Sequence, residues 1–169
     1  QRGVSSVEAM SGATTCAVRL VDVDDVPALA LLYAACARQL GPEVYTPEQV
    51  AAWESFCAYT PAFRDYILGA ATWGAFDDAG GPVAGFCGID ATGEVRSLYV
   101  RPELTRQGLG TRLLTHALEQ ARRSGQSRFT AWATPFSLPV FHRAGLHLVG
   151  TVREPFCGVS FERYRVEGA

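Results

Sequence analysis

The chain has 169 residues, of which 48% are hydrophobic and 19% charged, which suits one globular domain with a sizeable core and leaves too little chain for two. Its formal net charge of -2 lacks the basic excess that attracts nucleic acid or an anionic membrane surface. No apolar run approaches the roughly 20 residues that span a bilayer. We therefore expect neither a nucleic-acid partner nor a membrane partner.

The cysteines and the first residues bear on where the protein works. Five cysteines lie far apart with no C-x-x-C pair, so they read as small apolar side chains in a reducing compartment, and we expect a cytoplasmic protein. The opening stretch QRGVSSVEAMSG has no charged region followed by an apolar core, and the only methionine is Met10. We expect residues 1–15 to be a flexible tail or an expression remnant, and residues 16–169 to form a single domain.

The first part of the chain predicts a strand followed by two helices. Apolar residues alternate over residues 18–23, and the acids that follow are typical of a helix start, with Pro27 in the first turn and Gly41 at the end. A second helix is predicted from Thr46, where Gln49 completes a capping box. Residues 60–70 fit either a short helix or a loop lying over a site.

The remainder predicts a sheet with two more helices. Three strand-like runs separated by turn residues indicate an antiparallel meander, and a strongly amphipathic helix follows it over residues 108–124. The predicted strands are residues 72–76, 83–89, 94–100, 128–132, 146–152 and 159–166, with a short helix over 137–144. This order indicates a mixed α/β fold in which the strands before and after the helix 108–124 run parallel through a right-handed crossover.

The stretch LYVRPELTRQGLGTRLL, residues 98–114, joins a strand to that helix through two closely spaced glycines. A dinucleotide fingerprint needs a third glycine and a later acid, and a P-loop needs Gly-Lys-Ser/Thr, so neither nucleotide motif is present. What remains is a helix N-terminus whose free N–H groups suit a pyrophosphate. A purely structural corner that packs the helix on the sheet stays an equal alternative.

Residues 94–149, about a third of the chain, resemble the coenzyme A-binding core of the GNAT superfamily of N-acetyltransferases. The resemblance rests on a strand ending in LYV, a proline two residues later, RQGLGTRLL opening an amphipathic helix, and FHRAGL after the next strand. The resemblance implies a mostly antiparallel central sheet that contains a splayed parallel pair and is flanked by helices. The family prefers Gln or Arg at the position of Thr105, which weakens the motif.

The resemblance also implies a binding mode for acetyl-CoA that depends mainly on the backbone. The main chain of Leu98 and Val100 would pair with the pantetheine arm, and the Leu98 N–H would stabilise the oxyanion formed during transfer. Tyr99 would line the cofactor or acceptor pocket, or simply pack on the sheet, and Ser137 would contact the arm or only cap a helix. The residues expected at the pyrophosphate are Arg106, Gln107, Gly108, Leu109, Gly110 and Thr111.

Acetyl transfer to an amine needs a base for the ammonium proton and, in some enzymes, an acid for the leaving thiolate. Glu94 stands where several GNAT members carry a catalytic glutamate, although an acid beside a turn is also common for structural reasons. His142 stands where the family often has a tyrosine acid, and the alternative is a solvent-facing histidine on an amphipathic helix.

The sequence contains no motif for metal-dependent or covalent catalysis. Neither His116 nor His147 has metal-ligand spacing to the other, to a cysteine or to a nearby carboxylate pair, and no nucleophile elbow is present. We therefore expect no metal and direct transfer in a ternary complex. We expect an N-acetyltransferase that acts on a primary amine of a small molecule or peptide, as a monomer or homodimer. The alternative is a CoA-binding sensor or degenerate acyltransferase domain without turnover.

Overall fold

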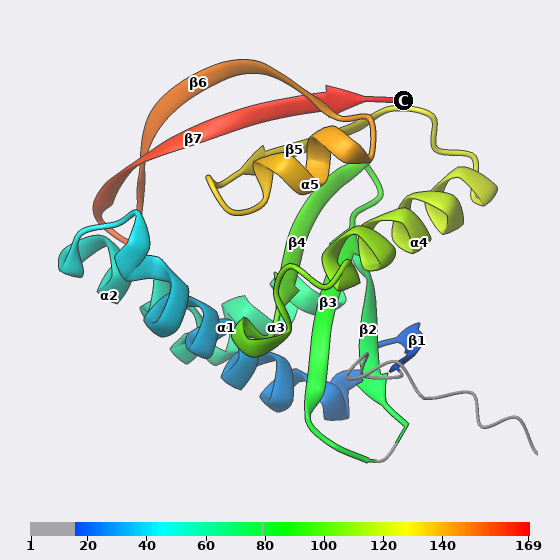
Figure 1. The fold of residues 1–169 in the computed structure, drawn as a ribbon, viewed down its shortest axis with the longest axis horizontal. Coiled ribbons are helices and arrows are strands. Elements are labelled where there is room, and N and C mark those ends of the chain that lie inside the picture. Colours follow the sequence, from blue (N-terminus) through cyan, green and yellow to red (C-terminus); the bar gives the residue numbers. More distant parts are fainter. Residues whose placement is uncertain (1–15, 79) are drawn as a thin grey trace, which may run out of the picture.

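One seven-stranded sheet runs through the protein in the order β1-β2-β3-β4-β5-β7-β6 (Figure 1). The computed structural model describes residues 16–78 and 80–169, so the predicted tail at residues 1–15 lies outside the described residues. The strands are β1 (Cys16–Leu20), β2 (Ala71–Asp77), β3 (Val83–Ile89), β4 (Glu94–Val100), β5 (Phe129–Ala133), β6 (His147–Phe156) and β7 (Val159–Gly168). The helices are α1 (Val26–Leu40), α2 (Pro47–Ser55), α3 (Thr60–Leu68), α4 (Leu109–Arg123) and α5 (Leu138–Arg143).

The sheet is antiparallel except at β4 and β5, which confirms the predicted fold class. These two strands pair in parallel only at Glu94 with Thr130 and at Val95 with Ala131, and α4 makes the crossover between them. Beyond Val95 the strands separate. A gap between two parallel strands therefore opens in the middle of the sheet.

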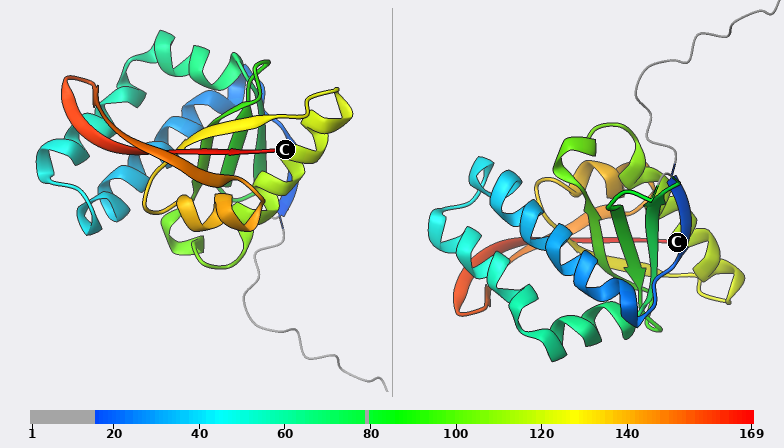
Figure 2. Two further views of the ribbon diagram at one scale, coloured as in Figure 1. Left: turned by 90° about the horizontal axis from the view of Figure 1, so that it is seen from above. Right: turned by 90° about the horizontal axis from the view of Figure 1, so that it is seen from below.

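Helices cover both faces of the sheet and build two apolar cores (Figure 2). Leu113, Leu114 and Leu118 of α4 form one core with Phe141 of α5. On the other face, the aromatic and aliphatic side chains of the first three helices form the second core, which includes Leu29, Tyr33, Trp53, Phe63 and Ile67. Residues of β3 contribute to both cores, with Ala84, Cys87 and Ile89 in the first and Val83 and Phe86 in the second.

The structure corrects the predicted end of the first strand and decides the conformation of residues 60–70. The first strand ends at Leu20 instead of residue 23, because Asp22 and Asp25 form a capping box that starts a short 3-10 helix there. The undecided segment 60–70 forms the helix α3, in which Phe63 and Ile67, four residues apart, are both buried. Tyr66 of this helix donates its hydroxyl to the Arg96 carbonyl of β4, next to the last residue of β4 that pairs with β5.

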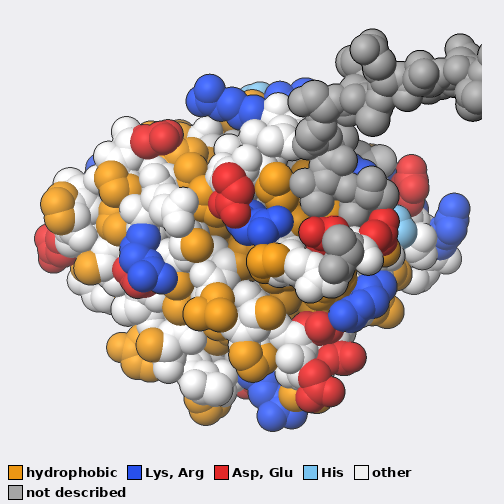
Figure 3. All heavy atoms as spheres, turned by 60° about the horizontal axis from the view of Figure 1, so that its bottom comes forward, with side chains coloured by type: hydrophobic (Ala, Val, Ile, Leu, Met, Phe, Trp, Pro, Cys, Tyr) orange, Lys and Arg blue, Asp and Glu red, His pale blue; other side chains and the backbone are white. Residues whose placement is uncertain are grey.

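The long β6–β7 hairpin forms one edge of the sheet, and its turn reaches α2 (Figure 1). The side-chain amide of Gln49 donates to the Ser160 carbonyl at 3.0 Å, which fixes this contact. None of the described helices is long and apolar enough to cross a membrane. On the face drawn in Figure 3, positive and negative side chains are interspersed among apolar ones, so the electrostatic potential of that face has no single sign.

Candidate active site

The gap between β4 and β5 presents unpaired backbone groups of β4. The register between β3 and β4 skips Arg96, which is a β-bulge. The Arg101 N–H donates to the Ala84 carbonyl of β3 at 2.8 Å, and the main-chain groups of successive residues point to opposite sides of a strand. The N–H and C=O groups of Leu98 and the N–H of Val100 therefore face the gap, whereas the Val100 carbonyl accepts a hydrogen bond from the Cys36 thiol of α1 at 3.2 Å.

The turn from β4 into α4 supplies a cluster of free donors. Within the described part of the chain, the N–H groups of residues 106–111 make no backbone hydrogen bond, whereas the next one, of Arg112, donates to Gly108. Gly108 has φ +82° and open space where a side chain would be, and Arg106 also has a positive φ of 64°. This is the geometry of an anion-binding helix N-terminus with room for a ligand.

A cavity of about 710 Å³ connects this turn with the gap. Most of the predicted cofactor residues line it: Leu98, Tyr99, Val100, Arg106, Gly108, Gly110, Thr111 and Ser137. The side chains of Gln107 and Leu109 lie elsewhere, since Gln107 donates to the Glu103 carbonyl and Leu109 packs on the core beneath α4. The roles predicted for these two positions concern only their backbone.

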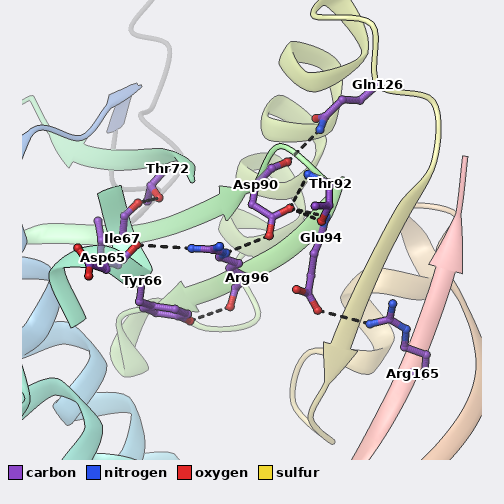
Figure 4. Close-up of polar contacts among 10 residues, drawn as sticks. All are labelled: Asp65, Tyr66, Ile67, Thr72, Asp90, Thr92, Glu94, Arg96, Gln126 and Arg165. Atoms are coloured by element: carbon purple, nitrogen blue, oxygen red, sulfur yellow. Dashed lines mark hydrogen bonds and ion pairs between the residues drawn. The ribbon is translucent and has the colours of Figure 1, made fainter. Parts of the chain in front are cut away.

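A smaller cavity of about 380 Å³ lies against α3 and contains Glu94. Val95, Arg96 and Trp132 line both cavities, so the two spaces adjoin at the point where β4 and β5 separate. Figure 4 shows the side chains of Glu94 and Arg96 leaving β4 in different directions, the first toward Arg165 of β7 and the second toward α3. The Glu94 Oε1 and Arg165 Nη1 atoms are 3.4 Å apart.

Asp90 holds the start of β4 in place. Its Oδ1 accepts hydrogen bonds from the backbone and hydroxyl of Thr92 and from the Glu94 N–H, and its Oδ2 accepts from Arg96 Nε at 3.0 Å (Figure 4). Burial alone would raise the Asp90 pKa, but these donors outweigh it and lower the pKa below its usual value. The carboxylate thus fixes both Glu94 and Arg96 at the smaller cavity.

Tyr99 belongs to the aromatic core on the α1 face. Its ring centroid lies 5.0 Å from that of Tyr33, and burial raises the Tyr99 pKa to about 12. Tyr66 of the same core donates its hydroxyl to the Arg96 carbonyl at 2.7 Å. Tyr99 therefore combines both interpretations of the sequence, since it packs on the sheet and also lines the larger cavity.

Ser97 is a polar group that the sequence analysis missed. It lines the larger cavity, it is 4% exposed, and its Oγ makes no hydrogen bond within the described residues. A buried hydroxyl without a partner is unfavourable unless a ligand or water satisfies it. Its only signal in the sequence was its place directly before Leu98.

The structure places His142, the predicted acid, outside both cavities and Ser137 within the larger one. His142 is exposed, its ring faces that of His147 at 5.9 Å between centroids, and it lines neither cavity. Ser137 lines the larger cavity, but its hydroxyl accepts from the Thr134 N–H instead of capping α5. The position of His142 gives its predicted role as an acid no support. No metal-binding group of three ligands occurs in the described ranges.

Comparisons with known proteins agree with this geometry. Residues 42–167 match the model of the acetyltransferase (GNAT) domain. A GCN5-related N-acetyltransferase from Rhodopseudomonas palustris superposes with a TM-score of 0.85 at 22% identity, over 92% of this chain and 96% of that one. PaiA N-acetyltransferase from Thermoplasma acidophilum, solved in complex with coenzyme A, gives 0.75 at 17% identity, over 91% and 98%.

A third structure, YncA from Salmonella typhimurium with its cofactor acetyl-CoA, gives a TM-score of 0.61 at 19% identity, over 90% of this chain and 92% of that one. A search among curated proteins finds no match. At these identities the structural likeness concerns the fold, while the domain match covers most of the sequence. The protein belongs to the GNAT family of acetyltransferases and is an N-acetyltransferase, which confirms the resemblance found in its sequence.

Proposed function

We propose that the protein transfers the acetyl group of acetyl-CoA to a primary amine of a small molecule or peptide by direct attack within a ternary complex. The observation that carries this proposal is the meeting of the two cavities at Val95, Arg96 and Trp132. The larger cavity has the free N–H groups and the strand edge that suit a pyrophosphate and an amide-bearing arm. The smaller one has a carboxylate beside the junction.

The residues present suit each step of that reaction. The amine nitrogen attacks the thioester carbonyl, whose oxygen accepts a hydrogen bond from the Leu98 N–H while it carries negative charge. Glu94 removes one proton from the bound ammonium before this attack, directly or through a water, and the second proton leaves the nitrogen for solvent as the amide forms. The carbon–sulfur bond then breaks and the thiolate leaves with CoA, taking a proton from solvent. These steps do not use His142, so its role as an acid remains a separate prediction.

Release of free thiol on addition of candidate amines tests the proposal. Turnover with any amine supports the transferase, and CoA binding without thiol release by a broad panel of amines would favour a sensor or degenerate domain. A purely structural glycine turn predicts no thermal shift with acetyl-CoA. We propose the cytoplasm as the site of action, since the cysteines at positions 16, 36, 57, 87 and 157 are all free thiols.

A further inference from the structure

We infer, on the basis of the proposed acetyl transfer, that the acceptor is an amine with a carboxylate a few bonds from its nitrogen, as in an amino acid. The smaller cavity is its binding site. Its charged lining consists of two carboxylates, Asp65 and Glu94, and two guanidiniums, Arg96 and Arg163. The ammonium of a zwitterion would lie against the two carboxylates, and its carboxylate would lie against the two guanidiniums. A polyamine would place positive charge against the guanidiniums, and a purely anionic compound would face the carboxylates.

The two guanidiniums are oriented from outside the cavity and keep donors for a ligand. Arg96 donates through Nε to Asp90, and Arg163 donates through Nη1 to Glu154, each at 3.0 Å. Asp90 and Glu154 do not line the cavity. An arginine has five N–H donors in a planar fork, so both side chains retain several that can bind a ligand carboxylate in bidentate geometry.

Trp132 contacts both Arg163 and Arg165. The guanidinium carbons of Arg163 and Arg165 lie 4.7 Å and 4.8 Å from the centroid of its ring. Arg165 in turn reaches Glu94. One rigid ring thus contacts both the Arg163 guanidinium and the arginine that pairs with Glu94. A molecule whose amine and carboxylate are a few bonds apart can place its amine at Glu94 and its carboxylate at Arg163.

Asp65 provides the second carboxylate. It is exposed on α3, and its carboxylate makes no hydrogen bond or ion pair within the described residues, although its backbone carbonyl accepts from Arg96. A bound ammonium beside Glu94 and Asp65 has two negative partners. The rest of the lining, Ala62, Tyr66, Val95 and Trp132, offers mainly apolar walls, and the volume suits a compound of amino-acid size.

The experiment compares amino acids with their own amides. Glycine, L-leucine and L-phenylalanine are each paired with the corresponding primary amide, and kcat/KM for thiol release is measured with saturating acetyl-CoA. We expect the carboxylates to be preferred by at least about tenfold, the factor of one charge-assisted hydrogen bond. The amide's amine loses its proton more readily, which works against this preference, so reactivity alone cannot produce it.

Matched variants test whether Arg163 causes the preference for amino acids over their amides. Arg163→Gln should lower kcat/KM for the amino acids much more than for the amides, so that the preference for the carboxylates falls by about tenfold, with the melting temperature measured to verify folding. Arg153→Gln is the control, because Arg153 is an exposed arginine of β6 outside the cavity. Amides that react as well as the amino acids, or a preference that survives Arg163→Gln, would overturn the inference.

Calorimetry separates this inference from the proposed function. The same pairs are titrated into protein saturated with CoA. If no compound releases thiol, the proposed transfer fails, and binding alone then decides: tighter binding of the amino acids supports the carboxylate site, whereas equal or absent binding refutes it. If thiol is released from amides and amino acids alike, the transfer stands and the carboxylate site does not.

Discussion

Arg165 Nη1 lies 3.4 Å from Glu94 Oε1, which links the start of β4 to a strand 71 residues later in the chain. Arg165 also pairs with Trp132 in the ladder between β5 and β7. The carboxylate that we propose as the base is therefore braced across the splayed strands. Its position depends on β5 and β7 as well as on its own strand.

Glu94→Gln should lower kcat by about a hundredfold or more, the usual range for loss of a general base. The KM for acetyl-CoA should change little, because Glu94 lines the smaller cavity and not the larger one. Thiol release at varied amine and acetyl-CoA concentrations measures both. Glu119→Gln on the exposed side of α4 is the control, and an unchanged kcat for Glu94→Gln would remove Glu94 from the mechanism.

Gly110→Glu should weaken CoA binding by about tenfold or more, since it adds bulk and negative charge beside the proposed pyrophosphate site. Gly110→Ala is the matched variant: a Cβ there lies 3.5 Å from Val100 and 3.9 Å from Val140, which is ordinary contact. Calorimetric titration with CoA distinguishes the two. Wild-type affinity in a folded Gly110→Glu protein would place the pyrophosphate elsewhere.

His142→Gln should leave kcat within about twofold of wild type, because the imidazole faces His147 and lines neither cavity. General acid catalysis typically contributes 10²–10⁴-fold. A loss of that size, with an altered alkaline limb of the pH–rate profile, would restore His142 as the acid. Steady-state kinetics from pH 6 to pH 10 provides the measurement.

Asp90→Asn should lower the free energy of unfolding at pH 7 by about 1–3 kcal/mol, as expected when a buried charged hydrogen bond to Arg96 is lost. Because the native pKa of Asp90 is lowered, its contribution is complete above the unfolded value of about 3.9 and disappears as the pH falls through the native value. Urea unfolding at pH 7 and near pH 2 should thus show a difference that shrinks in acid. Asp78→Asn, in an exposed turn, is the control, and a pH-independent difference would contradict the assignment.

Ser97→Ala should leave the stability of the ligand-free protein unchanged or raise it by about 1 kcal/mol, because the hydroxyl has no partner within the described residues. If a bound substrate or its water uses this hydroxyl, kcat/KM should fall by about tenfold. Chemical unfolding and thiol release measure the two effects. A clear loss of stability in the free protein would mean that the hydroxyl has a structural partner.

The sequence by itself indicated the order of most elements and the strand-to-helix turn at which we propose that the cofactor binds. Periodicity defined β3, β4 and α4, and the stretch 98–114 indicated a strand edge followed by a helix N-terminus, because backbone groups at a strand end and a helix start depend on local conformation. The same reasoning left residues 60–70 undecided. Phe63 and Ile67 stabilise α3 only through an aromatic core that other segments supply.

Only the tertiary structure decided which charged side chains share the smaller cavity. Glu94 and Arg165 meet across two strands, and Asp65 and Arg163 come from α3 and β7. It also decided that His142 lines neither cavity. A short helix such as α5 has too few turns for its apolar pattern to specify one buried face, and long-range ion pairs leave no periodic trace in the sequence, so their geometry follows from packing alone.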